Sequence, residues 1–186
     1  MDSDLVGRAL AFAARAHTGQ LRKGTSIPYI VHPAEVAAIC ARLTSDERAI
    51  AAAALHDVVE DTPFTLEDIR AEFGDRVAEI VEAETCDVPE EATWRQCKLE
   101  TLRKISETQD RDVLCVSLAD KLSNMRSMRK DTLELGEAHW SRFHVDDPKE
   151  HAWYYRSLTR ELARTLSDTL EWRELSALVE EVFGRV

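Results

Sequence analysis

One stretch of the sequence, AIAAAALHD at residues 49–57, decides the fold class. Ahead of it, Thr44 and Glu47 have the spacing of a capping box, which marks the start of a helix. A helix that is apolar on all sides is typical of the buried centre of a helical fold. The run is far shorter than the ~20 apolar residues that a membrane-spanning helix needs, so we expect a core helix.

Helix signals occupy most of the remaining chain. Glycine (6) and proline (5) are together about half as frequent as in an average protein, so few residues interrupt helices. No stretch alternates for long enough to predict a strand. Apolar periodicity and capping residues predict helices over about residues 4–17, from 33, 44–55, 65–73, from 75, 93–108, 112–129, from 147 to beyond 162, and 172–182. The sequence therefore predicts a single all-α domain over residues 1–186.

The charge of the chain excludes two classes of partner. The chain carries 24 Lys+Arg against 35 Asp+Glu, a formal net charge of −11. A general nucleic-acid binder or a protein that docks on an anionic membrane needs a basic surface, so we expect neither. The acids gather at residues 60–91, and we interpret most of them as solvated helix faces. Residues 7–34 hold four bases and no acid, which leaves room for a small, strongly anionic ligand.

The cysteines indicate the compartment. None of the four forms a CxxC pair, which excludes a zinc ribbon or a thioredoxin-type motif. Cys115 stands between Leu114 and Val116, in an apolar setting. We therefore expect buried free thiols and a cytoplasmic protein, since the N-terminal residues show no secretory signal.

Metal-type side chains stand at three places where an apolar core would not favour them. His32 precedes Pro33 at a loop-to-helix junction, and His56-Asp57 ends the most apolar helix. Asp120 interrupts an apolar stripe on its predicted helix. A buried carboxylate is costly unless it is paired or binds a metal. Taken alone, this pattern also fits a core histidine with ordinary hydrogen bonds.

Five short motifs narrow the choice: HTGQLRKG at 17–24, PYIVHP at 28–33, AALHDVVEDT at 53–62, FG at 73–74 and LADKLSNMR at 118–126. In this order they closely resemble the hydrolase domain of the RelA/SpoT family, within the HD-domain metal phosphohydrolases. The resemblance runs from about residue 5 to residue 162 and includes no synthetase domain. It implies a single HD-domain helical bundle of about 9–10 helices. It also implies a stand-alone small alarmone hydrolase, similar in plan to the metazoan SpoT homologue.

The resemblance implies a metal site built from His32, His56, Asp57 and Asp120. Two imidazoles and two carboxylates suit Mn²⁺ and tolerate Fe²⁺ or Zn²⁺. The ligand set alone does not choose among these metals, and the family implies one Mn²⁺ ion. A closed thiolate zinc site is excluded because no cysteine belongs to the set.

The family assigns a water-activating role to Glu60 and Asp61, which follow His56 and Asp57 at i+4 each. If the helix continues, the pair lies one turn beyond the ligands on the same side. The alternative is that the two acids merely end a helix. An acidic pair is unfavourable at a helix C-terminus, which favours the functional interpretation.

Substrate contacts are implied at five positions. The family places Arg22 and Lys23 on the phosphates and Asn124, at i+4 from Asp120, on the nucleoside. Lys98 lies where relatives carry a phosphate-binding lysine, although that segment aligns poorly. Tyr154 lies where relatives place an aromatic residue near the ribose or base, and core packing explains it equally well.

Two positions depart from the usual pattern Ala-Asp-Arg-x-His-Asn-Met-Arg of long family members. This chain has Lys121 for the arginine and Ser123 for the histidine, which leaves the base preference open. We interpret His17 as structural support for the site. Outside the motifs, we expect a surface or packing role for His139, His144 and His151.

The sequence thus predicts an Mn²⁺-dependent enzyme that removes the 3′-pyrophosphate of guanosine 3′,5′-bis(diphosphate), (p)ppGpp, giving GDP or GTP and pyrophosphate. Its partner would be this small nucleotide, an alarmone of the stringent response. One alternative keeps the chemistry and prefers (p)ppApp or NADPH. A second is a catalytically silent HD domain that binds alarmone as a sensor. The oligomeric state, monomer or homodimer, is left open.

Overall fold

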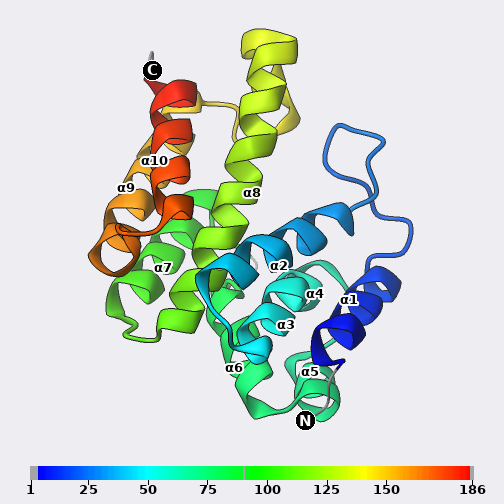
Figure 1. The fold of residues 1–186 in the computed structure, drawn as a ribbon. Coiled ribbons are helices and arrows are strands. Elements are labelled where there is room, and N and C mark those ends of the chain that lie inside the picture. The colour runs from blue at the N-terminus through cyan, green and yellow to red at the C-terminus, as the bar shows by residue number, and fades with distance from the viewer. Residues whose placement is uncertain (1–3, 90, 185–186) are drawn as a thin grey trace.

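A computed structural model describes residues 4–89 and 91–184, and its secondary structure is helical throughout (Figure 1). Within these residues there is no strand, only an isolated bridge between Leu21 and Pro28. The all-α prediction is therefore confirmed. The described helices are α1 (Leu5–Ala16), α2 (Val31–Leu43), α3 (Glu47–Leu55), α4 (Val58–Asp61), α5 (Leu66–Phe73), α6 (Asp75–Glu84), α7 (Trp94–Glu107), α8 (Arg111–Leu135), the 3₁₀ helix η1 (Gly136–Arg142), α9 (Pro148–Leu166) and α10 (Leu170–Phe183).

Helix α3 is the buried centre that its sequence predicted. Ala49 and residues 51–55 are fully buried, and α1, α2, α6 and α8 pack around them. Alanine side chains let these helices approach α3 closely, since interaxial distance depends on the side chains at the contact. The buried run therefore fixes the positions of α2 and α8, which carry two of the expected metal ligands.

The predicted cap of α3 is wrong in detail. Its N-cap is Asp46, whose side chain accepts a hydrogen bond from the Arg48 backbone N–H. Thr44 instead accepts from the Asp46 backbone N–H and donates to Asp112. An aspartate two positions nearer the helix satisfies the free N–H groups directly, so the expected capping box is not needed. The expected box of Thr93 and Gln96 does form, at the start of α7.

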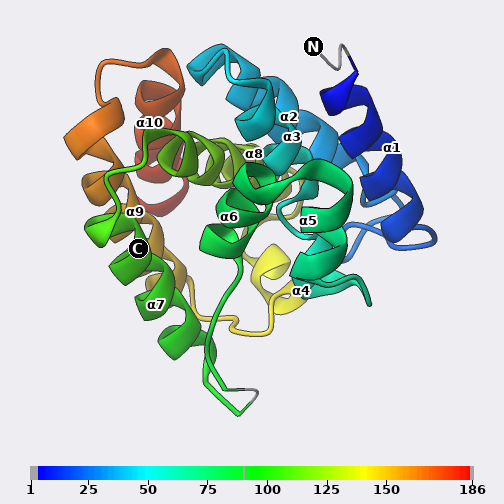
Figure 2. The same ribbon diagram turned by 90° about the horizontal axis from the view of Figure 1, so that it is seen from below.

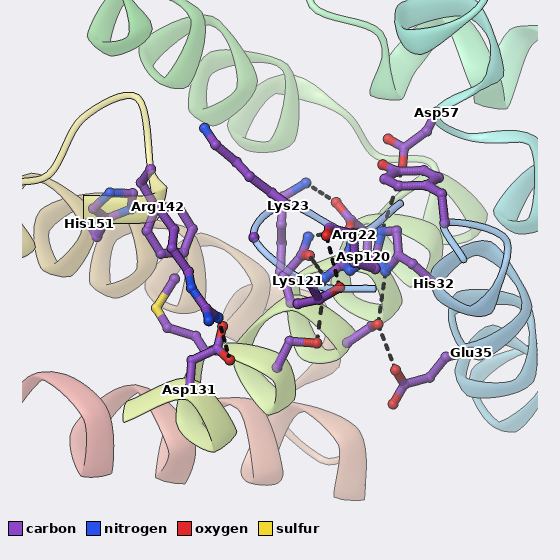
Figure 3. A pocket seen from close by; sticks show the side chains of 18 of the residues that line it. Arg22, Lys23, His32, Glu35, Asp57, Asp120, Lys121, Asp131, Arg142 and His151 are labelled. Carbon is purple, nitrogen blue, oxygen red and sulfur yellow. Dashed lines mark hydrogen bonds and ion pairs between the residues drawn. The ribbon is translucent and has the colours of Figure 1, made fainter. Parts of the chain in front are cut away.

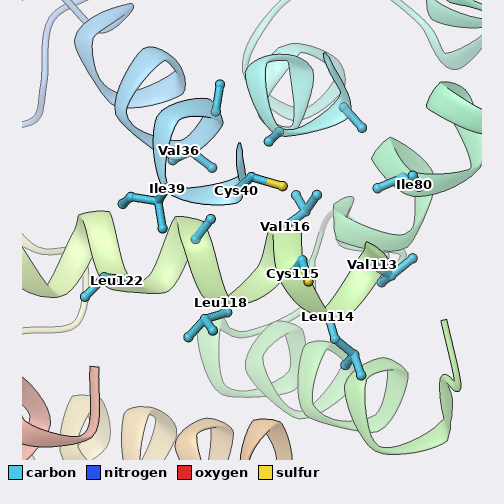
Figure 4. Close-up of a cluster of buried hydrophobic side chains, with 14 of the residues drawn as sticks. Val36, Ile39, Cys40, Ile80, Val113, Leu114, Cys115, Val116, Leu118 and Leu122 are labelled. Atoms are coloured by element: carbon cyan, nitrogen blue, oxygen red, sulfur yellow. The ribbon is translucent and has the colours of Figure 1, made fainter. Parts of the chain in front are cut away.

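Helix α8 is the longest element, and it joins the two sides of the molecule. On one side it packs against α2, α3 and α6, and on the other against α9 and α10. In Figure 4, Val36, Ile39 and Cys40 of α2 lie on the side of α8 from which Val116 projects, whereas Leu118 projects from the opposite side. Figure 2 shows α7 and α9 side by side, across the molecule from α1. None of the described helices is long and apolar enough to cross a membrane.

The free-thiol prediction is confirmed for two cysteines and wrong for the other two. Cys40 and Cys115 are buried and free, and burial raises the pKa of both thiols. Cys86 and Cys97 form a disulfide, with 6.1 Å between their Cα atoms. The fold brings the segment after α6 against the first turn of α7. Residue spacing alone does not reveal that approach.

Candidate active site

Four expected ligands from three regions of the chain converge on one point. His32 lies in the first turn of α2, His56 and Asp57 form the break between α3 and α4, and Asp120 lies in the middle of α8. Asp57 Oδ2 is 3.0 Å from His56 Nε2 and 3.5 Å from His32 Nε2. Asp120 Oδ1 is 3.1 Å from His32 Nε2 and 3.6 Å from His56 Nε2. Both imidazole Nε2 atoms thus face both carboxylates.

The donor set fits a divalent cation. One ligand atom each of His32, His56 and Asp57 lie within 4.8 Å of one another. His56 Nδ1 lies 2.8 Å from the Ala53 carbonyl oxygen, to which it donates, so the Nε2 lone pair faces the carboxylates. Nε2 itself is buried and has no hydrogen-bond partner among the described residues. A histidine held at one nitrogen by a carbonyl, with the other aimed at carboxylates, is arranged as metal-binding histidines are.

The two buried carboxylates of the cluster stabilise a positive charge between them. Burial disfavours the imidazolium form of His56, yet Asp57 and Asp120 hold its pKa well above the usual value. Burial likewise opposes ionisation of the two carboxylates, but the charge of His56 keeps the pKa of Asp57 well below its usual range. Lys121, followed by the two histidines, does the same for Asp120. A proton and a metal cation therefore compete for Nε2 of His56.

Both carboxylate ligands are held by neighbouring side chains. Tyr29 Oη donates to Asp57 Oδ2 at 2.7 Å, and Asn124 Nδ2 donates to Asp120 Oδ1 at 2.6 Å. Lys121 forms an ion pair with Asp120 Oδ2. Such supporting contacts orient ligands and tune the affinity of a metal site.

Ser123 holds His32 as Tyr29 holds Asp57. Its Oγ is 2.9 Å from His32 Nδ1 and donates to Glu35 Oε2 at 2.8 Å. Arg126 in turn donates to Glu35 Oε1 at 3.0 Å. The serine that departs from the family pattern is thus part of the support of a ligand.

The acidic pair follows the ligands on the short helix α4. The Asp61 backbone N–H donates to the Asp57 carbonyl at 2.9 Å, so the pair stands one turn beyond the ligands despite the break after Leu55. Glu60 lines the cavity described below, and its Oε1 accepts a hydrogen bond from the Cys86 backbone N–H. Asp61 is not among the described residues that line the cavity. Burial, together with the charge of Asp57, raises its pKa.

A cavity of about 790 Å³ opens beside the cluster (Figure 3). Arg22 Nη2 donates to Asn124 Oδ1 at 3.0 Å, which ties the loop before α2 to α8. Lys98 Nζ lies 5.2 Å from the ring centroid of Tyr154. Burial lowers the Lys98 pKa. All five expected substrate-binding residues line this cavity, namely Arg22, Lys23, Lys98, Asn124 and Tyr154.

Tyr154 fits both interpretations that the sequence left open. Only 2% of it is exposed, as for a core residue. Yet it lines the cavity, and its hydroxyl has no partner among the described residues. His17 is buried against the Tyr29 ring, with 4.8 Å between centroids, and so supports the tyrosine that holds Asp57.

Several cavity residues carry no sequence signal. Glu84 ends α6 and lines the cavity, and burial raises its pKa to about 7. Asp131 and Arg142 also line it, and no motif marks either one. His151, expected on the surface or in packing, is buried and borders the cavity as well. Only their tertiary position distinguishes these side chains from the many other charged residues of the chain.

A helical fold whose buried His and Asp side chains meet at the ends and middle of packed helices defines a metal-binding protein of the HD class. The model of the family described as HD domain matches residues 9–140, and the chain belongs to that family. The family expected from the motifs is thereby confirmed.

Relatives with assigned functions match part of the chain. It is 44% identical over 119 residues to a guanosine-3′,5′-bis(diphosphate) 3′-pyrophosphohydrolase of Haemophilus influenzae, covering 62% of this chain and 17% of that protein. It is 40% identical over 124 residues to the Escherichia coli bifunctional (p)ppGpp synthase/hydrolase SpoT, covering 65% of this chain and 18% of SpoT. The chain thus spans about a sixth of the length of these curated relatives.

Two solved structures match more of the chain. The structure of lmo0812 from Listeria monocytogenes EGD-e has a TM-score of 0.74 and 29% identity, over 82% of this chain and 99% of that one. A metazoan ortholog of SpoT that hydrolyzes ppGpp has a TM-score of 0.76 over 100% of this chain and 97% of its own, at 24% identity. The second likeness shows a shared fold.

Proposed function

We propose that this protein is an Mn²⁺-dependent hydrolase that removes the 3′-pyrophosphate of (p)ppGpp. One observation carries the proposal: a single cavity is lined by the His-Asp cluster, by Glu60 and by the basic side chains Arg22, Lys23 and Lys98. A metal-type cluster beside several positively charged side chains suits a ligand that carries many phosphate charges. The names of the bacterial relatives agree with this substrate.

In the proposed reaction, water attacks the phosphorus attached to the 3′ oxygen, and the bond between this phosphorus and the 3′ oxygen breaks. The attacking oxygen leaves with pyrophosphate, and the 3′ oxygen takes up a proton to become a hydroxyl. A divalent cation held by His32, His56, Asp57 and Asp120 would polarise the phosphoryl group and acidify water. Glu60 and Asp61 would orient the water and accept its proton. Burial and the charge of Asp57 raise the pKa of Asp61, which makes its carboxylate a stronger base.

The basic side chains would hold the phosphates. Arg22 is fixed by Asn124 and can bind a phosphate bidentately, whereas Lys23 and Lys98 act as point charges. Burial lowers the pKa of Lys98, and a bound phosphate would raise it again by stabilising the ammonium form. Asn124 and Tyr154 would contact the nucleoside.

The test is release of pyrophosphate from ppGpp by purified protein loaded with Mn²⁺, with Fe²⁺ and Zn²⁺ as comparisons. A Glu60→Gln, Asp61→Asn double variant should lose about 10²- to 10⁴-fold in kcat, the usual contribution of general acid–base catalysis. It should still bind nucleotide. Glu67→Gln, an exposed acid on α5, serves as the matched control and should keep full activity.

The outcomes separate the alternatives. Binding of ppGpp without turnover by metal-replete protein would support the silent sensor and refute the hydrolase. Turnover confined to ppApp or NADPH would keep the chemistry and replace the substrate. We further propose that residues 1–186 act as one unit in the cytoplasm, and gel filtration of the same preparation would distinguish monomer from homodimer.

A further inference from the structure

The cavity extends past the metal cluster along α8. On one face of this helix, at intervals of three and four residues, lie Asp120, Asn124, Ser127 and Asp131. All four line the cavity. Asp131 follows Asp120 by eleven residues, about 16 Å along the helix axis. Figure 3 shows Asp131 on the side of the cavity away from His32.

At this distal end Asp131 is paired with Arg142, the last residue of η1. Arg142 Nη1 lies 3.1 Å from Asp131 Oδ1, and the two side chains are 27% and 22% exposed. The loop that carries Arg22 and Lys23 lies against the other side of the arginine. A Cβ placed on Gly24 would stand 2.7 Å from Cδ of Arg142. The pair is therefore held in place by three segments: the loop, α8 and η1.

The pair keeps unused hydrogen-bonding capacity toward the cavity. A carboxylate has about four acceptor positions and a guanidinium five donors, and the ion pair uses one of each. Met128 and Phe143, which also line the cavity, add apolar surface next to the pair. Acceptors, donors and apolar surface together match the edge and face of a nucleobase.

The carboxylate of Asp131 and the guanidinium of Arg142 match the hydrogen-bonding groups of guanine better than those of adenine. The Watson–Crick edge of guanine offers N1–H and N2–H₂ as adjacent donors, which one carboxylate can accept together. Its O6 and N7 atoms are acceptors for an arginine. Adenine instead presents an unprotonated N1, which would face the carboxylate with lone pair against lone pair. A carboxylate in contact with this edge therefore favours guanine.

We infer that Asp131 and Arg142 read the base of the nucleotide and select guanine over adenine. This inference rests on the proposed function, because it places the 3′-pyrophosphate at the metal cluster and the base at the distal end. It assigns the choice between ppGpp and ppApp, which the motifs leave open, to two residues outside every motif.

The test compares kcat/KM for ppGpp and ppApp in three proteins. The unmodified protein should prefer ppGpp by more than tenfold. Asp131→Asn should lower that preference at least tenfold, because the carboxamide accepts only one guanine donor well and its NH₂ can donate to N1 of adenine. Asp146→Asn, an exposed aspartate outside the cavity lining, is the matched control and should keep the original ratio.

The ratio separates recognition from general damage. If Asp131→Asn slows both substrates equally, the ion pair only braces η1 and the inference is refuted. If the unmodified protein hydrolyses neither nucleotide, the proposed function fails, and calorimetric binding of GDP and ADP still tests the pair. GDP should then bind at least tenfold more tightly than ADP, and Asp131→Asn should remove the difference. Equal binding would refute the inference. Arg142→Gln provides an independent variant that should also lower the guanine preference.

Discussion

Replacing Ser123 by alanine should weaken metal binding without touching a ligand. Ser123 Oγ lies 2.9 Å from His32 Nδ1 and donates to Glu35 Oε2 at 2.8 Å. Alanine removes both contacts, so the His32 ring loses the partner that fixes its tautomer and orientation. Glu35 keeps the hydrogen bond from Arg126 and stays in place. The expected defect is therefore confined to the imidazole that faces the carboxylates.

The magnitude can be estimated in two ways. Loss of a supporting hydrogen bond typically costs a metal site about 10- to 100-fold in affinity, which is about 1.4–2.7 kcal/mol. Leaving one buried donor unsatisfied costs about 1–3 kcal/mol. The two estimates agree, so we expect Ser123→Ala to raise the dissociation constant for Mn²⁺ by about one to two orders of magnitude.

The assay is a calorimetric titration of metal-free protein with Mn²⁺ at fixed pH, which does not depend on catalysis. Ser127→Ala is the matched control, since this serine lies on the same face of α8 and its Oγ is 3.5 Å from Arg22 Nη2. The control should bind Mn²⁺ as the unmodified protein does. Unchanged affinity in Ser123→Ala would show that the Ser123–His32 contact does not support the site.

Three further predictions concern stability. Burial raises the Glu84 pKa from 4.5 to about 7, so its favourable contribution is present below pH 4.5 and is lost as pH rises through 7. Glu84→Gln should therefore stabilise the metal-free protein at pH 8, by up to about 3 kcal/mol, and give no gain at pH 4.5 in urea unfolding. Leu118→Ala empties a fully buried site and should cost about 2–5 kcal/mol of unfolding free energy. Reduction of the Cys86–Cys97 disulfide should lower stability by about 3 kcal/mol through chain entropy, and a Cys86→Ser, Cys97→Ser variant should not respond to reductant.

Each stability prediction has a control. Glu82→Gln changes an exposed acid of the same helix and should change the unfolding free energy equally at pH 8 and pH 4.5. If Glu82→Gln shows the same pH dependence as Glu84→Gln, Glu84 is excluded as its cause. Leu133→Ala removes a side chain that is 68% exposed and should change stability by less than about 0.5 kcal/mol. A melting temperature that reductant leaves unchanged in the unmodified protein would contradict the disulfide.

Much of the fold follows from local sequence because helix signals are local. Thr93 and Gln96 form the expected capping box, and Asp147 caps α9 ahead of Pro148 as its sequence indicates. The predicted cap of α3 was wrong because Thr44 and Asp46 compete for this role within one turn. Asp46 is the residue that reaches the free N–H groups. Such competition is decided by geometry at the scale of single hydrogen bonds.

The candidate site divides in a similar way. The motifs indicated His32, His56, Asp57 and Asp120 through the family that they resemble, and the cost of burying an unpaired carboxylate agrees with a metal site there. They did not reveal what supports these groups. Ser123 was a departure from the family pattern, and only its position beside His32 gave it a role.

The sequence by itself determined that the chain is helical and that α3 is its buried centre, and its motifs indicated a metal-type cluster. His32 and Asp120 are 88 positions apart in the sequence. Packing of α2 and α8 around the alanines of α3 decided that His32 Nε2 lies 3.1 Å from Asp120 Oδ1. Packing also decided that Cys86 meets Cys97 and that Asp131 lines the same cavity as the cluster. The physical reason is that helix propensity and burial cost act residue by residue, whereas contacts between distant residues depend on how whole helices fit together.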